Sequence, residues 1–275
     1  MNLNDYFSNS ELIIHAGGMG ERWYEVNGGQ YPKALTLIGK KPRPILDWVI
    51  LPYVAAGMKH IYISLWHKAD MVIEHCEKIE KNSDIKFTFL IEPEDKRLGR
   101  AGVIKYYLEN RTLDKDKPKI ITNASDILRV NIKEFVKFHA IGLEKGFLGT
   151  MVCSPSDASQ FGHVDCDPNT KALKRFVEKP VIELPKGKYI NTAMYYLDSG
   201  FNKYFLEIPE GELPVDFEKS NMLQKMLPKI RCFEHVIPFK SWIWFKTPKD
   251  YSMAKNMDME KFLEISSVEK YLGHL

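Results

Sequence analysis

Short apolar runs rich in β-branched residues alternate with stretches of helical periodicity through the first 150 residues of the chain. The pattern predicts strands at 11–17, 60–66, 85–93, 118–128 and 147–154, and helices at 44–58, 69–81, 99–110 and 131–146. Strand–helix alternation of this kind is typical of a doubly wound α/β fold with a mostly parallel sheet. Because ligands of such sheets bind beyond the carboxyl ends of the strands, the residues that follow each strand are the first candidates for a site.

The alternation changes after about residue 150. Two short strands joined by an Asp-Pro-Asn turn are expected in 161–180, followed by a strand at 188–198, a helix at 216–229, a strand at 232–239 and a C-terminal helix at 248–265 that Pro248 opens. No internal repeat and no Gly/Ser linker separates the two parts. We therefore expect a single domain over 1–275, with one part at about 11–150 and a second at about 151–275.

Composition excludes several classes of function. The 275 residues are 44% hydrophobic, which suffices for the core of one large α/β domain. Basic and acidic residues nearly balance, 39 against 36, and no long basic run occurs, so we expect no nucleic-acid partner. No apolar run approaches the ~20 residues that span a bilayer, so we expect no membrane partner. The four cysteines lack metal-binding spacing, which predicts buried free thiols in a reducing cytoplasm.

The first predicted strand runs into the sequence HAGGMGER, residues 15–22. Gly17, Gly18 and Gly20 permit positive φ and let backbone N–H groups approach an anion, and Arg22 adds a fork of donors for phosphate oxygens. A dinucleotide fingerprint would read G-x-G-x-x-G with an acidic residue after the next strand, and a Walker loop would continue G-K-S/T. Neither is present, which disfavours an NAD(P)-linked enzyme. The glycines alone leave a polyphosphate loop and a plain tight turn both open.

The residues after this loop read YPKALTLIGKKPRPIL, with Lys33 directly after Pro32. Together with GGMGER they resemble the opening pattern of the sugar-1-phosphate nucleotidyltransferases, which is G-G-x-G-x-R, then P-K and K-P-I-L. Further pieces follow in the family's order: RLGRAG resembles L-G-T-A-G, NASDIL its N-G-D strand end, FGHV its Y-G-V-V, FVEKP its F-x-E-K-P and INTAMYYL its I-N-A-G-I-Y. The resemblance implies a Rossmann-like, doubly wound, mostly parallel sheet that binds nucleotide, with a fused smaller sugar-binding β/α portion.

This resemblance implies that a nucleoside triphosphate (NTP) and a sugar 1-phosphate react to give a nucleoside diphosphate sugar and pyrophosphate. Such catalysis consists mostly of positioning and charge neutralisation. By resemblance the catalytic residues are Arg22, Lys33, Asp126 and Lys179, the nucleotide-binding residues are Gly17, Gly18, Gly20, Glu92 and Gly99, and the sugar-phosphate-binding residues are Gly162, Glu178, Lys179 and Asn191. Asp126 is also the expected ligand of a Mg²⁺ cofactor.

Structural interpretations of the same residues stay open at this point. Asp126 could cap the helix that follows it, and Lys33 and Lys179 could be solvated surface charges. Asn191 could form hydrogen bonds within a turn, and Gly162 could be a turn glycine. The aromatic sequence MYY, residues 194–196, is expected in the core.

The resemblance also implies which residue reads the base, because in the family this is often the residue that begins the segment leading into L-G-T-A-G. That residue is Glu92 here, ahead of RLGRAG. An ionised carboxylate only accepts hydrogen bonds. It therefore suits the N1–H and N2–H₂ donors of guanine, or the amino group of cytosine, better than the O4 carbonyl of uracil or thymine. We rank GTP first and CTP second.

The chain departs from the family pattern near its C-terminus. The usual W-x-D-x-G-T-P reads Trp242 to Pro248 here, with Trp244 at the position of the Asp and Lys246 at that of the Gly. In the family this Asp is a second metal ligand, and Trp cannot take that role. The metal would then be held by Asp126, phosphates and water alone. Alternatively, Asp216 or Glu218 could contribute a ligand, or Lys246 could replace part of the positive charge. Other departures are Ser125 before the Asp, Glu21 and Trp23 beside the glycine loop, and Arg100 in place of the Thr of L-G-T-A-G.

These departures support a second hypothesis, a catalytically weakened homologue that binds nucleotide sugar and regulates or scaffolds a partner. The retained phosphate-binding cations and Asp126 favour the active enzyme instead. A homo-oligomer stays open.

Overall fold

The computed structural model describes residues 3–156, 160–180, 188–219, 221–234 and 240–273. The chain forms two compact units, each made of three chain segments. Unit 1 comprises Met1–Glu11, Glu92–Ile121 and Lys133–Ile237, and unit 2 comprises Leu12–Ile91, Thr122–Ile132 and Pro238–Leu275. The single nucleotidyltransferase domain expected over 1–275, with parts at about 11–150 and 151–275, stays a prediction.

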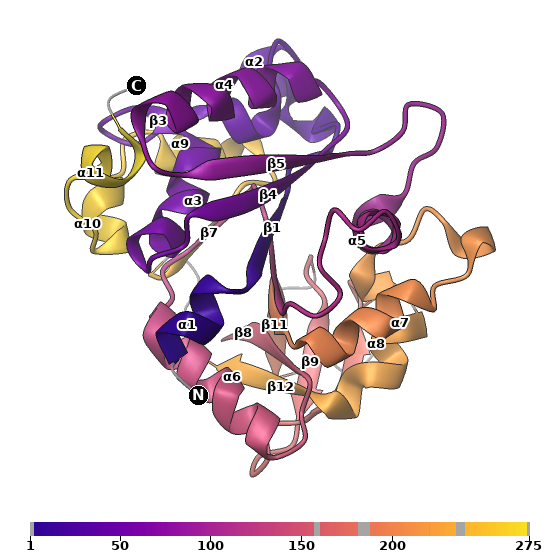
Figure 1. Ribbon diagram of the computed structural model, residues 1–275. Helices are drawn as coiled ribbons and strands as arrows, with labels where there is room; N and C mark the ends of the chain where they lie inside the picture. The colour runs from indigo at the N-terminus through magenta and orange to yellow at the C-terminus, as the bar shows by residue number, and fades with distance from the viewer. Residues whose placement is uncertain (1–2, 157–159, 181–187, 220, 235–239, 274–275) are drawn as a thin grey trace. The chain divides into compact units, whose positions relative to one another are not determined.

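Unit 2 is built on a parallel sheet. Strand β1 (Glu11–His15) pairs in parallel with β4 (His60–Leu65), and β4 pairs in parallel with β5 (Lys86–Ile91), as Figure 1 shows. Ile61, Ile63 and Leu65 lie on one face of β4 and are fully buried, and Tyr62 and Ser64 on the other face are buried as well. Strands buried on both faces are typical of a parallel sheet covered by helices, here α3 (Ile45–Ala55) and α4 (Ala69–Asn82).

Short elements complete unit 2 around this sheet. They are η1 (Glu21–Trp23), α2 (Tyr24–Asn27), η2 (Lys33–Leu35), β2 (Leu37–Ile38), β3 (Arg43–Pro44), β7 (Asp126–Leu128), β13 (Trp242–Trp244), α9 (Pro248–Ala254), α10 (Met259–Leu263) and α11 (Val268–Leu272). Strands β7 and β13 pair antiparallel and form a separate two-stranded ribbon. This ribbon is where the candidate metal ligand is found.

The single C-terminal helix expected at 248–265 is wrong, because α9 and α10 are separate helices. The first helix ends at Ala254, and Asp258 caps the second, since its Oδ1 accepts a hydrogen bond from the backbone N–H of Lys261 at 3.1 Å. The Met257 carbonyl between the two helices accepts from the Lys40 backbone N–H at 2.9 Å. Long-range pairing of the chain therefore interrupts a helical pattern that looked continuous. Pro248 opens α9 as predicted.

Unit 1 is built around β11 (Tyr189–Leu197). This strand pairs antiparallel with β6 (Lys119–Asn123), β8 (Gly149–Pro155) and β9 (His163–Cys166); β9 pairs antiparallel with β10 (Leu173–Val177), and β8 pairs in parallel with β12 (Ile230–Glu234). The helices of the unit are α1 (Leu3–Ser8), α5 (Gly99–Glu109), α6 (Ile132–Glu144), α7 (Asn202–Leu206) and α8 (Asn221–Met226), together with short turns η3 (Ser199–Phe201) and η4 (Glu210–Glu212). The predicted turn between β9 and β10 is confirmed, because Asp167 Oδ1 accepts from the backbone of Asn169 and Thr170 at 3.0 and 2.8 Å.

The helix expected at 216–229 is also wrong. In its place are the short turn η5 (Phe217–Lys219), α8 and the turn η6 (Leu227–Lys229). Pro228 lacks the N–H that a continuing helix needs, which accounts for the end of α8. Similarly, the strand expected at 232–239 begins earlier, at Ile230, and its expected end at 235–239 lies outside the described residues.

Within the part of the chain that the structure describes, no helix has both the length and the apolar character needed to cross a bilayer. The predicted α/β fold with parallel strands is confirmed.

Candidate active site

The three glycines after β1 have three different surroundings. A Cβ on Gly17 would lie 3.0 Å from the backbone N of Trp66, because the ends of β1 and β4 approach closely here. Gly20 has a φ of 66°, in the left-handed region that disfavours side chains. A Cβ on Gly18 would meet no heavy atom within 4 Å. The need for glycine at positions 17 and 20 is therefore structural, and Gly18 leaves its backbone open to an approaching group.

A cavity of about 300 Å³ opens beside this loop. It is lined by Met19, Gly20, Glu21, Arg22, Trp23, Lys33 and Lys246, all of them in unit 2. The lining therefore includes three cationic side chains, those of Arg22, Lys33 and Lys246, and one carboxylate, that of Glu21. Such a surplus of positive charge around a glycine loop suits a polyphosphate.

Trp23 and Lys33 tie the loop to the turn that follows β13. The buried indole of Trp23 donates to Thr36 Oγ1 at 2.8 Å and packs edge-on against Phe245. Lys33 Nζ donates to the Phe245 carbonyl at 3.0 Å. Burial lowers the pKa of Lys33; Asp126 acts in the opposite direction, and Arg22 in the same direction. Lys33 is therefore a largely desolvated cation, not the solvated surface charge of the alternative interpretation.

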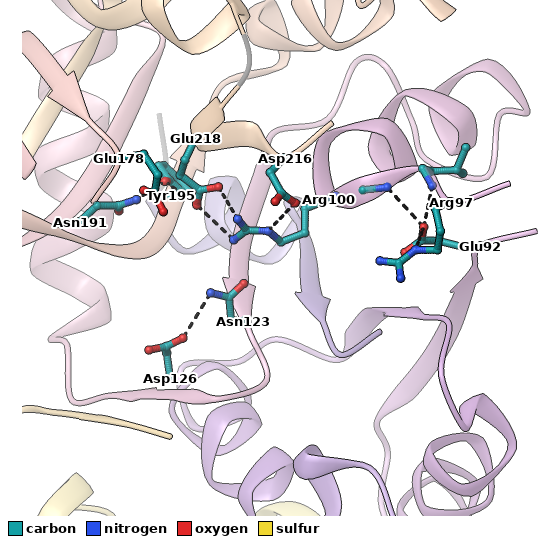
Figure 2. Close-up of polar contacts among 12 residues, drawn as sticks. Glu92, Arg97, Arg100, Asn123, Asp126, Glu178, Asn191, Tyr195, Asp216 and Glu218 are labelled. Atoms are coloured by element: carbon teal, nitrogen blue, oxygen red, sulfur yellow. Dashed lines mark hydrogen bonds and ion pairs between the residues drawn. The ribbon is translucent and has the colours of Figure 1, made fainter. Parts of the chain in front are cut away.

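Asp126 lies in β7, directly opposite Trp244 of β13. Its Oδ1 accepts from the indole N–H of Trp242 at 3.1 Å. Its Oδ2 accepts from the Asn123 amide at 3.2 Å, as Figure 2 shows. Burial raises the pKa of Asp126, and the nearby ammonium groups of Lys246 and Lys33 lower it. Since Asp126 is a strand residue and α6 begins only at Ile132, the alternative that it caps this helix is wrong.

The residues around Asp126 fit a magnesium ion that is held mainly by substrate. No group of three or more His, Cys, Asp or Glu side chains in the described part of the chain could hold a metal ion. Mg²⁺ is commonly bound through one or two carboxylates together with phosphates and water, so it needs no such group. Each carboxylate oxygen has two lone pairs, which leaves Asp126 acceptor capacity beyond its hydrogen bonds. Trp244 has no acceptor to add.

Glu92 follows β5 and holds the start of α5. Its Oε2 accepts from the backbone N–H groups of Leu98 and Gly99 at 2.7 and 3.3 Å, and from Arg97 Nε at 3.2 Å (Figure 2). The other carboxylate oxygen, Oε1, takes part in none of these three bonds. The expected role of Glu92 in reading a base therefore rests on Oε1, and it stays a prediction.

Gly99 is required by the backbone around it. It has a φ of 72°, and a Cβ on it would lie 2.6 Å from the Val215 carbonyl oxygen. The Leu98 carbonyl accepts from Val215 N at 2.9 Å, and the Val215 carbonyl accepts from Ala101 N at 3.0 Å. These two backbone hydrogen bonds hold segment 213–218 against the first turn of α5. This packing explains Gly99 without a ligand, and nucleotide binding there stays a prediction.

Arg100, at the position of the family's Thr, forms ion pairs with two carboxylates of segment 213–218. Its Nε donates to Asp216 Oδ1 at 3.2 Å and its Nη1 donates to Glu218 Oε1 at 3.1 Å (Figure 2). Burial by itself lowers the pKa of the Arg100 guanidinium, but the charges of Glu218 and Asp216 outweigh it and raise the pKa. Asp216 and Glu218 therefore both pair with Arg100 within unit 1. The hypothesis that one of them replaces the missing metal ligand finds no support in these contacts.

Tyr195 extends this ion pair to a sugar-site candidate. Its hydroxyl donates to Glu218 Oε1 at 3.1 Å and accepts from the amide of Asn191. The Asn191 Oδ1 in turn accepts from Ala193 N at 2.8 Å, at a bulge where Ala193 has a φ of 62°. The expectation that Tyr195 belongs to the core is confirmed, because the residue is 1% exposed. Asn191 already has local partners for both ends of its amide, and its binding to sugar stays a prediction.

The remaining sugar-site candidates lie around β10. A Cβ on Gly162 would lie 2.5 Å from Phe176 Cζ and 2.8 Å from Glu178 Oε2, so no side chain fits there. Lys179 Nζ lies 3.6 Å from Glu178 Oε1, and the Lys179 side chain is 58% exposed. Lys179 is thus an accessible cation beside a carboxylate.

The Nucleotidyl transferase family profile matches residues 11–252. The chain belongs to the nucleotidyl transferase family.

Two curated members of this family illustrate the relationship. The mannose-1-phosphate guanyltransferase of Eremothecium gossypii is 32% identical over 194 residues, which are 68% of this chain and 49% of the relative. The mannose-1-phosphate guanyltransferase 2 of Candida glabrata is 31% identical over 251 residues, 87% of this chain and 62% of the relative. The chain therefore spans about half to three-fifths of the length of these relatives.

A solved structure shows the same fold. The crystal structure of HddC from Yersinia pseudotuberculosis, complexed with GMP-PN, superposes with a TM-score of 0.68 at 24% identity. The superposition covers 92% of this chain and 99% of that chain.

Sequence reasoning missed most tertiary contacts of this nucleotidyl transferase, and three of them bear directly on the candidate residues. They are the indole N–H of Trp242 on Asp126, the hydroxyl of Tyr195 on Glu218 and the backbone of Val215 against Gly99. Only the first had a signal in the sequence, since Trp242 keeps the Trp of the family's W-x-D pattern.

Proposed function

We propose that this chain transfers the nucleoside monophosphate of an NTP, GTP by preference, to a sugar 1-phosphate. The products are a nucleoside diphosphate sugar and pyrophosphate. The observation that supports this most is the cavity lined by Arg22, Lys33 and Lys246 at the glycine loop, in a chain whose relatives are named mannose-1-phosphate guanyltransferases.

The proposed reaction needs no protein nucleophile. An oxygen of the sugar phosphate forms a bond to the α-phosphorus of the nucleotide, while the bond from that phosphorus to the bridging oxygen breaks and pyrophosphate leaves. The backbone of the glycine loop, Arg22 and Lys33 hold the triphosphate in place and stabilise the charge that builds up on the leaving group. Such fixed cations are effective because they need no reorganisation as the charge develops.

Asp126 is the proposed ligand for Mg²⁺, which when bound neutralises phosphate charge. Trp242 and Asn123 hold its carboxylate in one orientation, so that the carboxylate is positioned before substrate binds. Because Trp244 offers no oxygen, the remaining ligands would be phosphates and water.

On unit 1 we assign the sugar phosphate to Lys179. Its exposure and its neighbour Glu178 suit a cation that pairs with an incoming phosphate. Asn191, Glu178 and the space at Gly162 are the proposed contacts of the sugar. These assignments rest on the family motifs F-x-E-K-P and I-N-A-G.

The preference for guanine rests on Glu92 and on the names of the relatives. With Oε2 engaged by the start of α5, the proposed acceptor for the guanine donors is Oε1. A buried acceptor that pairs with N–H donors disfavours bases that present a carbonyl at the same place.

A catalytically weakened regulator is not favoured. The relatives of this chain are named as guanyltransferases, and the chain keeps Arg22, Lys33 and Asp126 in one unit. We also propose a cytoplasmic location, because Cys76, Cys153, Cys166 and Cys232 are free thiols, as expected in a reducing compartment.

The test is a four-way comparison of triphosphates. The full chain is incubated with Mg²⁺, each NTP and a panel of sugar 1-phosphates that includes mannose 1-phosphate, and pyrophosphate release is followed. We expect GTP to be used best, and Glu92→Gln to weaken the preference for GTP over the other bases. A Glu92→Gln variant that slows all four triphosphates equally would limit Glu92 to holding α5. Binding of a GDP-sugar without pyrophosphate release from any pair of substrates would instead support the regulatory hypothesis.

A further inference from the structure

Lys246 stands where this chain departs from its family's pattern, and it lines the same cavity as Arg22 and Lys33. The usual residue there is glycine, which has no side chain to contribute. A third cation in a cavity of this size changes the charge balance of the site, because the lining includes one carboxylate, that of Glu21.

The backbone of Lys246 is rigidly placed. Its N–H donates to Asp250 Oδ2 at 2.8 Å, and the N–H of Thr247 donates to the same oxygen at 2.7 Å. Asp250 and Thr247 also form the capping box that begins α9, with Pro248 in its first turn. A lysine on a fixed turn loses less backbone freedom when its ammonium binds an anion.

The residue before Lys246 fastens this turn to the rest of unit 2. The N–H of Phe245 donates to the Ser125 carbonyl at 3.0 Å, and its own carbonyl accepts from Lys33 Nζ at 3.0 Å. Lys246 therefore follows directly on the residue that positions Lys33. The ammonium of Lys246 also acts on Asp126, where it favours the charged carboxylate.

We propose that Lys246 is a third polyphosphate-binding cation, which holds the pyrophosphate portion of the nucleotide together with Arg22 and Lys33. The proposal rests on the proposed function for the identity of the anion. Trp244, two residues earlier, offers no ligand for a metal ion, and Lys246 supplies positive charge to the phosphates directly. The site then has an affinity for pyrophosphate that does not depend on Mg²⁺.

The test is a calorimetric titration of the full chain with inorganic pyrophosphate in the presence of EDTA. Lys246→Met removes the charge and keeps most of the side-chain volume, and Lys246→Arg keeps the charge. Lys249→Met is the matched control, because Lys249 is exposed, lies three residues further on and does not line the cavity. Circular dichroism checks that each variant is folded.

We expect Lys246→Met to bind pyrophosphate at least tenfold more weakly than the parent, with Lys246→Arg within about threefold of the parent and Lys249→Met unchanged. If Lys246→Met binds like the parent, or if the parent binds no pyrophosphate without metal, the proposal is wrong. In the first case Lys246 serves only to neutralise Asp126. Since the titration contains neither nucleotide nor sugar, its result is independent of whether the chain forms a nucleotide sugar.

Discussion

The indole N–H of Trp242 donates to Asp126 Oδ1 at 3.1 Å, across the two-stranded ribbon that β7 and β13 form. Trp244 lies on the same strand and packs against Trp242 with the rings at 62°. Trp242 thus donates a hydrogen bond to the carboxylate, and Trp244 pairs with Asp126 across the ribbon. The result is a buried Asp126 with a fixed orientation, which suits the metal-binding role that we propose for it.

Asp126→Asn is expected to lower the rate of pyrophosphate release and to raise the Mg²⁺ concentration needed for half-maximal rate. The amide keeps the shape of the carboxylate and loses the charge that attracts the cation. Trp242→Phe is a milder companion variant, because it removes one donor and leaves the charge. The measurement is a Mg²⁺ titration of each variant. An Asp126→Asn variant that titrates like the parent would show that Asp126 has a structural role only.

Arg22→Ala and Lys33→Ala are each expected to lower kcat/KM by about a hundredfold, the usual effect of losing a fixed cation that stabilises a leaving group. Steady-state kinetics with GTP and the preferred sugar 1-phosphate measure the effect. Lys59→Ala serves as the control, since Lys59 is an exposed lysine whose partner is the exposed Asp84. Turnover close to that of the parent in either variant would contradict the assignment of the triphosphate to this cavity.

Arg100→Met is expected to destabilise the chain by about 2 kcal/mol, because it leaves Glu218 with a buried charge and no cation. Glu218 is 5% exposed at its side chain and Asp216 is 35% exposed, so most of the cost should come from Glu218. Urea unfolding measures the free energy. Adding Glu218→Gln to Arg100→Met should recover part of the loss. If the loss of unfolding free energy in the double variant equals the sum of the losses in the two single variants, the two residues are not coupled.

The stability of unit 1 is expected to depend on pH through His139. Burial lowers the pKa of His139 to about 3, with Asp198 acting in the opposite direction and Arg231 in the same direction. The ring stacks on Tyr196 at 4.1 Å and is hydrogen-bonded to Thr150. In the unfolded chain the pKa is roughly 6.5. Between these two values the unfolded state binds the extra proton, so stability is lost as pH falls below about 6.5 toward 3.

Replacing this histidine gives a direct check of that pH dependence. His139→Gln keeps hydrogen-bonding groups at the position and removes the titration. Its free energy of unfolding should therefore fall less steeply than that of the parent between pH 7 and pH 4, by up to roughly 1 kcal/mol per pH unit. Urea unfolding at several pH values gives both slopes. Parallel curves for the parent and the variant would assign the acid sensitivity to other groups.

Local pattern was enough to predict the parallel strands of unit 2 and the first four long helices to within a few residues. The alternation of buried β-branched runs with helical periodicity depends only on neighbouring residues, and so does the need for glycine at a turn such as Gly20. The order of the short motifs along the chain was also sufficient to recognise the nucleotidyl transferase family. The two predicted helices that proved wrong, at 216–229 and 248–265, were interrupted by contacts or by a proline within an otherwise helical pattern.

The polar contacts of the candidate site could only be found in the tertiary structure. Asp126 and Trp242 are 116 residues apart, Arg100 and Glu218 are 118 apart, and Lys33 lies 212 residues from the carbonyl that it contacts. Residue types and local periodicity determine which segments become strands and helices, because those depend on the backbone within a few residues. Which buried charge finds which partner depends on how distant segments pack, because a buried polar group is stable only beside a partner that folding brings to it.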